Sequence, residues 1–196
     1  HQGLSSISMI ANIPNMVYLA PSNAEEYIAM LDWALDQDKH PVYIAIPSGP
    51  VVHAEGPVRT NFDALNTYEV TRKGSKVAVL ALGDFYDLGE KTVEALSSTL
   101  EIEATLVKPY FASGVNQNLL DNLVKDHDVI VTIEDGIIEG GWGQNIASYL
   151  GTSSARVLNY GVKKAFYDRV NIVDLMRESH LDPKLIAADV KQVLGL

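Results

Sequence analysis

The chain has 196 residues and a formal net charge of -10 at pH 7, so it is long enough for one large or two small domains with a buried core. Its scattered acidic residues argue against nucleic acid or an anionic membrane surface as a partner. The lack of cysteine excludes disulfides and thiolate metal sites and fits a cytoplasmic protein.

The first fifty residues predict two strands joined by a helix. The strands are Met16–Ala20 and Val42–Ile46, each a short apolar run closed by proline. Ser22 and Glu25 have the spacing of a capping box, which would begin a helix that runs to about Asp36. The apolar positions of that helix recur at helical spacing and predict packing on a sheet: Ile28, Leu31, Ala34 and Leu35, with Met30 and Trp33 beside them.

Residues 51–74 are mixed and polar, contain Gly56 and Pro57, and predict a connection between two domains. Strands then alternate with helices in residues 75–196, which predicts an α/β fold with a doubly wound, mostly parallel sheet. The expected strands are 76–82, 102–107, 128–134 and 155–159. The expected helices are 85–100, 116–125, 143–150 and two near the C-terminus, the last with Asp182 at its N-cap and Pro183 at its first position.

The stretch from Asp128 to Gly143 is the most informative part of the second unit. Its β-branched run predicts a strand buried on both faces, and Glu134 and Asp135 follow at the carboxyl end, where ligands bind in open α/β sheets. The glycine-rich loop that follows could hold an anion at the start of a helix, or it could let that helix pack closely while Trp142 fills the gap. We favour the structural interpretation, because Glu134, Asp135 and Glu139 would repel a phosphate.

Other side chains show no spacing typical of a metal site. His40, His53, His127 and His180 lie far apart in the sequence and are expected to have surface or capping roles. Asp84 and Asp87 are expected to cap the helix near Phe85, and Tyr110 and Phe111 to form core and rim.

Seven short sequence motifs, taken in their order along the chain, carry the functional signal. These are His1-Gln2-Gly3, Ile13-Pro14-Asn15-Met16, Leu19-Ala20-Pro21-Ser22, Glu25-Glu26-Tyr27, Lys108-Pro109, Val131–Gly136 and Gly140–Gly143. Together they resemble the thiamine diphosphate enzymes of the transketolase group, and most closely the 1-deoxy-D-xylulose-5-phosphate synthases. The resemblance spans nearly the whole chain. It implies that residues 1–50 are the second half of a pyrimidine-binding domain, 51–74 a linker and 75–196 the C-terminal domain.

The resemblance also implies an activity. In that family the cofactor acts as an electron sink while pyruvate loses carbon dioxide and the product adds to glyceraldehyde 3-phosphate. His1 matches the family histidine that faces the substrate, where it donates to a developing alkoxide or relays a proton. The motifs for the diphosphate and magnesium, and the activating glutamate, belong to parts of the family fold before His1. We therefore expect thiamine diphosphate and magnesium in an intact enzyme, and no cofactor or metal on this chain alone.

Two departures from the family pattern bear on the substrate. Ala45 and Ser48 stand where the synthases carry arginines around a strand end, one of which is expected to hold the substrate phosphate. Neither side chain can replace the bidentate bonds of a guanidinium. Ser6 stands where the family usually has aspartate. A transketolase-like homologue with different substrates is therefore an alternative.

Two further alternatives concern the class of protein. The chain could be a non-catalytic assembly module that supplies dimer contacts, or part of the beta subunit of a 2-oxo acid dehydrogenase, which has a similar glycine-rich loop. The His1-Gln2-Gly3 and Ile13–Met16 words favour the synthase. The expected partners are small molecules, a 2-oxo acid and an aldehyde sugar phosphate, with a second copy in a homodimer. Because the chain does not open with methionine, we interpret it as a piece of a longer polypeptide.

Overall fold

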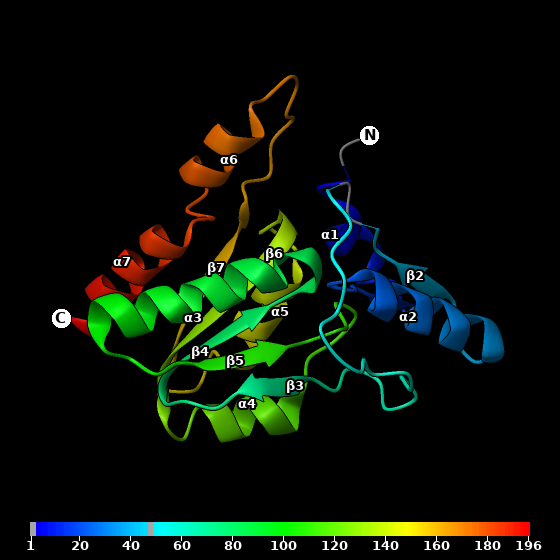
Figure 1. The fold of residues 1–196 in the computed structure, drawn as a ribbon, viewed down its shortest axis with the longest axis horizontal. Helices are drawn as coiled ribbons and strands as arrows, with labels where there is room; N and C mark the ends of the chain where they lie inside the picture. The colour runs from blue at the N-terminus through cyan, green and yellow to red at the C-terminus, as the bar shows by residue number, and fades with distance from the viewer. Residues whose placement is uncertain (1–2, 47–48) are drawn as a thin grey trace.

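The structure is a computed structural model that describes residues 3–46 and 49–196. Its larger part is a five-stranded sheet with the strand order β3-β5-β4-β6-β7 (Figure 1). The strands are β3 (Glu69–Arg72), β4 (Lys76–Ala81), β5 (Thr105–Lys108), β6 (His127–Ile137) and β7 (Arg156–Val162). The central pairs are parallel, and β3 adds an antiparallel edge.

Helices cover both faces of this sheet. Val77 and Val79 of β4 pack in one cluster with α3 (Tyr86–Leu100) and α7 (Pro183–Leu194). Alternate residues of the same strand, Ala78 and Leu80, pack in a second cluster with α4 (Gln117–Leu123) and α5 (Trp142–Tyr149). Three shorter helical segments are α1 (Ser6–Ile10), α6 (Ile172–Glu178) and the 3-10 turn η1 (Gly83–Phe85). The predicted doubly wound α/β fold is confirmed.

The N-terminal residues form a second, smaller layer beside the sheet. It contains the parallel strands β1 (Val17–Leu19) and β2 (Val42–Ile44), with α2 (Ala24–Asp36) between them in the chain. In Figure 1, α2 and β2 form the right-hand end of the molecule. The two layers meet where Leu19 of β1 bridges to Phe111, just after β5.

The predicted capping box was wrong by one residue. The N-cap of α2 is Asn23, whose side chain accepts a hydrogen bond from the Glu26 N–H at 2.9 Å. The Glu26 carboxylate reaches back to the Ser22 N–H at 2.8 Å. Glu25 instead accepts from the Ala54 N–H at 2.7 Å. The Glu26 carboxylate therefore bonds to the residue before the N-cap and not to the N-cap itself, so the pair differs from a capping box.

The predicted packing face of α2 was right for Met30 and Trp33 and wrong for Ile28 and Leu35. Ile28 and Leu35 are 54% and 76% exposed, whereas Met30 is fully buried. The helix packs on β1 and β2 through Ala29, Met30 and Trp33, so its buried face is rotated away from the stripe read from the sequence.

The structure differs from the sequence-based prediction in three smaller points. The polar strand β3 occupies the last part of the expected connection, where its alternating exposure marks a sheet edge. The N-caps of η1 and α3 are Leu82 and Phe85, so neither Asp84 nor Asp87 holds a cap position. The short helix α1 was not anticipated, although Ile7 within it is buried.

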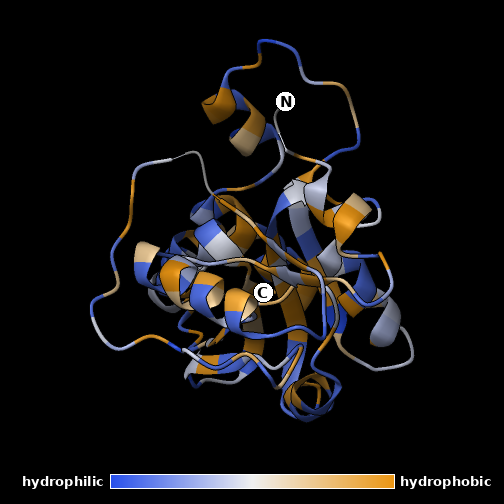
Figure 2. Cartoon of the chain, turned by 90° about the vertical axis from the view of Figure 1, so that its right-hand side faces the viewer, coloured by the Kyte–Doolittle hydropathy of each residue, from blue (hydrophilic) through white to orange (hydrophobic). Residues whose placement is uncertain are grey.

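Hydrophobic residues concentrate inside the layers and on the helix faces that touch them (Figure 2). Asp182 caps α7 by accepting from the Lys184 and Leu185 N–H groups, and Pro183 follows, as predicted. Across the described ranges, every helix is too short or too polar to cross a bilayer.

Candidate functional site

The carboxyl ends of β4 and β6 meet where the sheet reverses its order of winding. The chain places β5 on one side of β4 and then returns to place β6 on the other side. In doubly wound sheets, ligands bind in the crevice at such a switch point. Gly83 and Asp84 follow β4 there, opposite Glu134, Asp135 and Gly136, where the pairing of β6 with β7 shifts register.

A cavity of about 730 Å³ lies over this switch point, which we call the switch-point cavity. Its polar lining includes Ser6, Tyr18, Tyr43, Asp84 and Asp135. Its apolar wall includes Ile172, Leu175 and Met176 of α6. The described residues that line it include no lysine, arginine or histidine. The volume suits a small molecule, and the lining is acidic.

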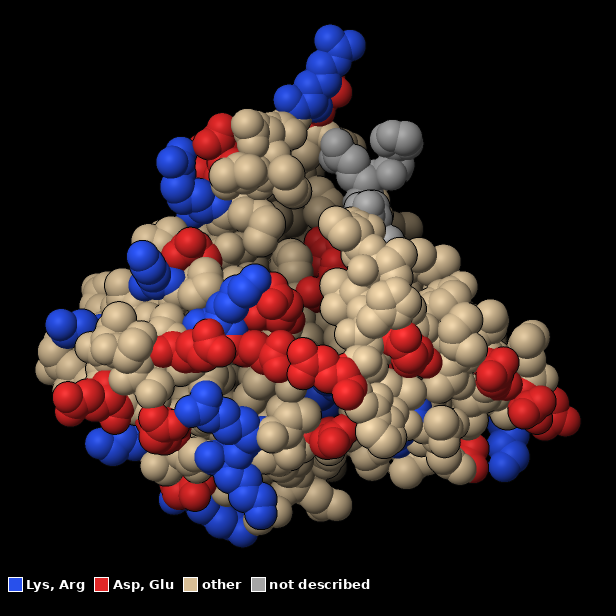
Figure 3. Space-filling view, viewed as in Figure 1, with Lys and Arg blue, Asp and Glu red and all other residues tan. Residues whose placement is uncertain are grey.

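Two exposed carboxyl groups of this cavity, those of Asp84 and Asp135, have raised pKa values. Desolvation raises the pKa of Asp84 to about 6, and the charge of Asp135 adds to the effect. Desolvation also raises the pKa of Asp135. Tyr18 donates to or accepts from Ser6 at 3.1 Å, and burial raises the pKa of its hydroxyl to about 12. Figure 3 shows acidic side chains in a band across one face and in the hollow between the layers. An anionic ligand would meet repulsion here.

The glycine-rich loop after β6 holds an internal carboxylate. Both oxygens of Glu134 accept backbone hydrogen bonds at the start of α5, from Trp142 at 2.9 Å and Gly143 at 2.8 Å. A Cβ added at Gly141 would lie 2.7 Å from the same carboxylate, so only glycine allows this approach. Trp142 is fully buried. The structural interpretation of this loop is confirmed, because Glu134 takes the N–H groups that an anion would use.

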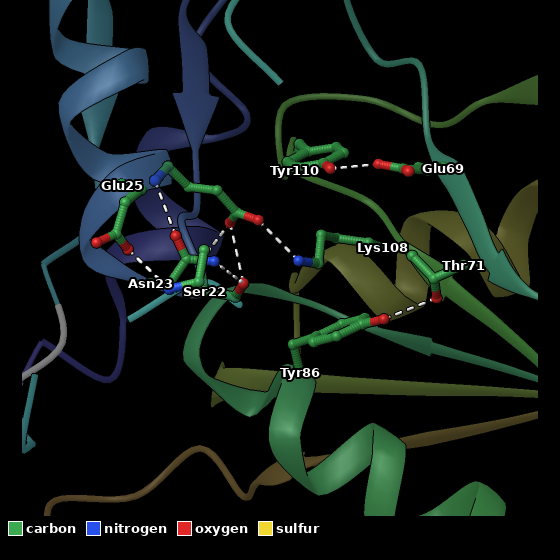
Figure 4. A network of polar contacts seen from close by, with 10 residues as sticks. Ser22, Asn23, Glu25, Glu69, Thr71, Tyr86, Lys108 and Tyr110 are labelled. Carbon is green, nitrogen blue, oxygen red and sulfur yellow. Dashed lines mark hydrogen bonds and ion pairs between the residues drawn. The ribbon is translucent and has the colours of Figure 1, made fainter. Parts of the chain in front are cut away.

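A second, larger cleft of about 1140 Å³ lies between α2 and the sheet edge formed by β3 and β5. Lys108 at the end of β5 pairs with Glu26 of α2 at 2.7 Å, and its ammonium lies 4.2 Å from the centroid of the Tyr86 ring (Figure 4). The Tyr86 hydroxyl donates to Thr71 at 2.7 Å. Tyr110, beside them, hydrogen-bonds to Glu69.

The Glu26–Lys108 ion pair joins the two layers. Glu26 is 2% exposed and also accepts from the Ser22 hydroxyl at 3.0 Å. A buried carboxylate needs such partners, because its charge is costly without them. The sequence words Glu25-Glu26-Tyr27 and Lys108-Pro109 contain both residues, yet nothing in the sequence indicates that they meet.

The structure describes some of the residues singled out from the sequence and not others. His1 and Ser48 lie outside the described residues. Ser6 and Ala45 both line the switch-point cavity, and the Ala45 N–H donates to Leu19 of β1 at 2.9 Å. Tyr110 and Phe111 are buried, and Tyr110 also lines the larger cleft. The cavity therefore brings together two of the positions at which the sequence departs from the synthase pattern.

The four other histidines do not come together. Each contacts a different residue: His40 contacts Asn15, His53 contacts Glu25, His127 contacts Thr105 and His180 contacts Asp189. In the part of the chain that the structure describes, no three acidic or histidine side chains are grouped to hold a metal ion.

The described residues do not fit a bound thiamine diphosphate. A diphosphate needs cationic or N–H donors. The switch-point cavity offers carboxylates instead, and the N–H groups at the start of α5 are taken by Glu134. The larger cleft has Lys108 and Arg59, but Lys108 is paired and Arg59 donates to the Thr67 carbonyl at 3.0 Å.

The fold and the site define a class of protein: a doubly wound α/β domain whose switch-point cavity is covered by a smaller α/β layer. The family model described as "Transketolase, C-terminal domain" matches residues 66–186. The chain belongs to that family.

Curated relatives match nearly the whole chain. A 1-deoxy-D-xylulose-5-phosphate synthase of Clostridium tetani is 29% identical over 99% of this chain and 31% of its own length. One of Pseudoalteromonas translucida is 37% identical over 85% of this chain and 26% of its own length. The chain thus spans about a third of the length of the curated relatives that it matches.

Solved structures agree on the fold. A structure titled "Split gene transketolase, inactive beta4 tetramer" has a TM-score of 0.79 and 22% identity, and covers 98% of this chain and 62% of its own. A transketolase variant from Pichia stipitis has a TM-score of 0.72 and 14% identity, and covers 96% of this chain and 26% of its own.

Proposed function

We propose that this chain is the C-terminal part of a thiamine diphosphate- and magnesium-dependent transferase, a 1-deoxy-D-xylulose-5-phosphate synthase. Its reaction is the condensation of pyruvate with glyceraldehyde 3-phosphate, with release of carbon dioxide, and the chain alone is inactive. The match of 99% of the chain to 31% of a curated synthase supports both statements. We place the protein in the cytoplasm, as a homodimer.

A chimera tests the reaction. The 196 residues replace the matching part of the Clostridium tetani relative, and product formation from pyruvate and glyceraldehyde 3-phosphate is measured for the chimera and for the chain alone. We expect turnover by the chimera only. Turnover by the chain alone, or none by a folded chimera, would contradict the proposal. Calorimetry of the chain with thiamine diphosphate and magnesium should show no micromolar binding.

His1 is the residue that we propose to act on the substrate. In the chimera, His1→Ala should lower kcat by about 100-fold, the usual size of one general acid–base contribution. His1→Gln keeps a hydrogen-bond donor without proton relay and should recover only part of that loss. Equal kcat in all three proteins would assign His1 no catalytic role.

The switch-point cavity favours a second candidate function, a transketolase-like enzyme whose acceptor carries no phosphate. Asp84, Asp135 and Ala45 line the cavity, and its described lining includes no cation. We expect the chimera to prefer glyceraldehyde over glyceraldehyde 3-phosphate. Ala45→Arg should shift the ratio of kcat/KM toward the phosphate by at least about 10-fold, through charge-assisted bonds. Ala45→Met, of similar reach and no charge, is the matched control.

A further inference from the structure

Two hydroxyl groups meet in the switch-point cavity on the side of the N-terminal layer. The hydroxyl of Tyr18 on β1 lies 3.1 Å from the Oγ of Ser6 on α1, and Tyr18 is buried whereas Ser6 is half-buried. The Tyr18 ring lies against the ring of Tyr43, its register partner on β2, with the centroids 4.6 Å apart. Tyr18 therefore holds the Ser6 hydroxyl, and Ser6 can both donate to and accept from a ligand.

Two carboxylates line the same cavity from the large domain. Asp84 follows β4 and Asp135 lies near the carboxyl end of β6, and both residues are exposed. No described side chain forms a hydrogen bond or an ion pair with either of them. A carboxylate only accepts hydrogen bonds, and its bonds with O–H donors are short and strong. Both carboxylates can therefore accept hydrogen bonds from a ligand.

The rest of the lining excludes several kinds of ligand. α6 contributes an apolar wall with Ile172, Leu175 and Met176, and the described lining residues include no lysine, arginine or histidine. A phosphate or a carboxylate would meet repulsion from Asp84 and Asp135. A hydrocarbon would leave both carboxylates without water or partners, which is costly. The cavity therefore suits a ligand that donates several hydrogen bonds and carries no negative charge.

Polyols and amines both meet that description, and the polyol fits better. Its hydroxyl groups can donate to both carboxylates and exchange hydrogen bonds with Ser6, while its C–H groups contact the aromatic rings and α6. The proposed reaction also consumes an aldehyde, which would condense with a free amine to an imine and water. The volume of about 730 Å³ lies in the range of pockets for drug-sized molecules, so there is room for a chain longer than a triose.

We propose that the switch-point cavity binds an uncharged aldose longer than a triose, which donates hydrogen bonds to Asp84 and Asp135 and bonds to Ser6, with Tyr18 as a positioning residue. The proposal rests on the transferase reaction proposed above, with this aldose as the acceptor in place of glyceraldehyde 3-phosphate. Pyruvate loses carbon dioxide, the remaining two-carbon unit bonds to the aldehyde carbon, and the aldehyde oxygen takes up one proton.

Binding to the 196-residue chain tests the cavity without turnover. The probe is D-glucitol, an open-chain polyol, and its anionic, cationic and three-carbon counterparts are glucitol 6-phosphate, D-glucamine and glycerol. Amide chemical shifts of Ser6, Tyr18 and Asp135 report the site. We expect saturable binding of glucitol, and binding of the phosphate and of glycerol weaker by at least about 10-fold. Equal binding of glucitol and its phosphate, tighter binding of glucamine, or no saturable glucitol binding by the folded chain would overturn the proposal.

A change of charge in the cavity is the second test. Asp135→Asn keeps the size of the side chain and removes its charge, so it should weaken glucitol binding by about 10-fold and reduce the discrimination against glucitol 6-phosphate. Asp128→Asn makes the same change at the exposed start of β6 and is the matched control, with no expected effect. The assignment of Asp135 is wrong if the two variants bind glucitol equally.

A double-mutant cycle tests whether Tyr18 acts through Ser6. Tyr18→Phe keeps the ring and removes the hydroxyl that contacts Ser6. It should weaken glucitol binding by about 3-fold in the parent chain and have no further effect in Ser6→Ala, because the two changes remove one shared interaction. Additive losses would show that Tyr18 has a separate structural effect and no positioning role.

Turnover by the chimera separates this proposal from the proposed reaction. We expect kcat/KM for D-erythrose to exceed that for D-erythrose 4-phosphate and for D-glyceraldehyde by at least about 10-fold. A preference for the phosphorylated tetrose or for the triose would overturn the assigned acceptor. If glucitol binds as expected and the folded chimera turns over no aldehyde, the proposed reaction fails and the polyol site remains.

Discussion

The two layers of this molecule are stabilised in different ways. The five-stranded sheet is covered by helices on both faces, and β4 is fully buried from Val77 to Ala81. The N-terminal layer has three-residue strands and leaves Ile28 and Leu35 of α2 exposed. The large domain therefore supplies its own core, whereas the small layer depends on its neighbours. The following substitutions test that difference.

The largest effect is expected from the core of the large domain. Trp142→Ala removes a fully buried ring whose Nε1 donates to the Tyr68 hydroxyl at 2.9 Å, and should lower the free energy of unfolding by about 4 kcal/mol. Met30→Ala in the small layer should cost about 3 kcal/mol of local stability. Amide exchange should accelerate throughout the sheet in the first variant and only within residues 17–44 in the second. Acceleration everywhere in both would mean that the layers unfold together.

The ion pair between the layers comes next. Lys108→Met leaves Glu26 buried without its cation and should cost about 3 kcal/mol in urea unfolding. Lys91→Met, which breaks an exposed pair with Asp87, is the control and should have little effect. If adding Glu26→Gln to Lys108→Met does not recover stability, the loss has a cause other than the unpaired carboxylate.

Glu134 should make the stability of the large domain depend on pH. Burial raises its pKa to about 7, against the opposing N–H bonds from Gly143 and Trp142. A raised carboxyl pKa favours folding at low pH, and this contribution is lost as the pH rises from about 4.5 through 7. Between pH 4 and pH 8 the protein should lose about 2 kcal/mol more stability than Glu134→Gln, which cannot titrate. Parallel stability profiles for the two proteins would contradict this assignment.

The smallest effect concerns the cavity between the layers. Asp84 has a pKa raised to about 6 from 3.8, so its charge opposes folding above pH 6 and not below pH 4. Asp84→Asn should stabilise the protein by about 1 kcal/mol at pH 8, after allowance for solvent screening, and by nothing at pH 4. Thermal unfolding at both pH values measures this, with the exposed Asp128→Asn as control. A gain of equal size at pH 4 would exclude the charge as its cause.

The large domain could be predicted from the sequence, because its elements carry strong local signals. The β-branched run of β6 and the Asp182 cap of α7 gave the right elements, and the acidic loop gave the right interpretation of Trp142. The packing face of α2 was predicted only in part, because periodicity does not show which side of the helix meets the sheet. The contacts between the two layers were harder still to predict from the sequence. Glu26 and Lys108 lie 82 residues apart, so only the tertiary fold brings them together.

The hydrogen bonds of the Glu134 carboxylate to the start of α5 limit which amino acids can replace Glu134. Its two oxygens each accept from a different main-chain nitrogen, so a substitute must have two acceptors and the same length. Aspartate is shorter by one methylene, and glutamine has a single acceptor oxygen. A saturation library at residue 134, selected for soluble protein, should therefore enrich the parental glutamate above all nineteen other amino acids.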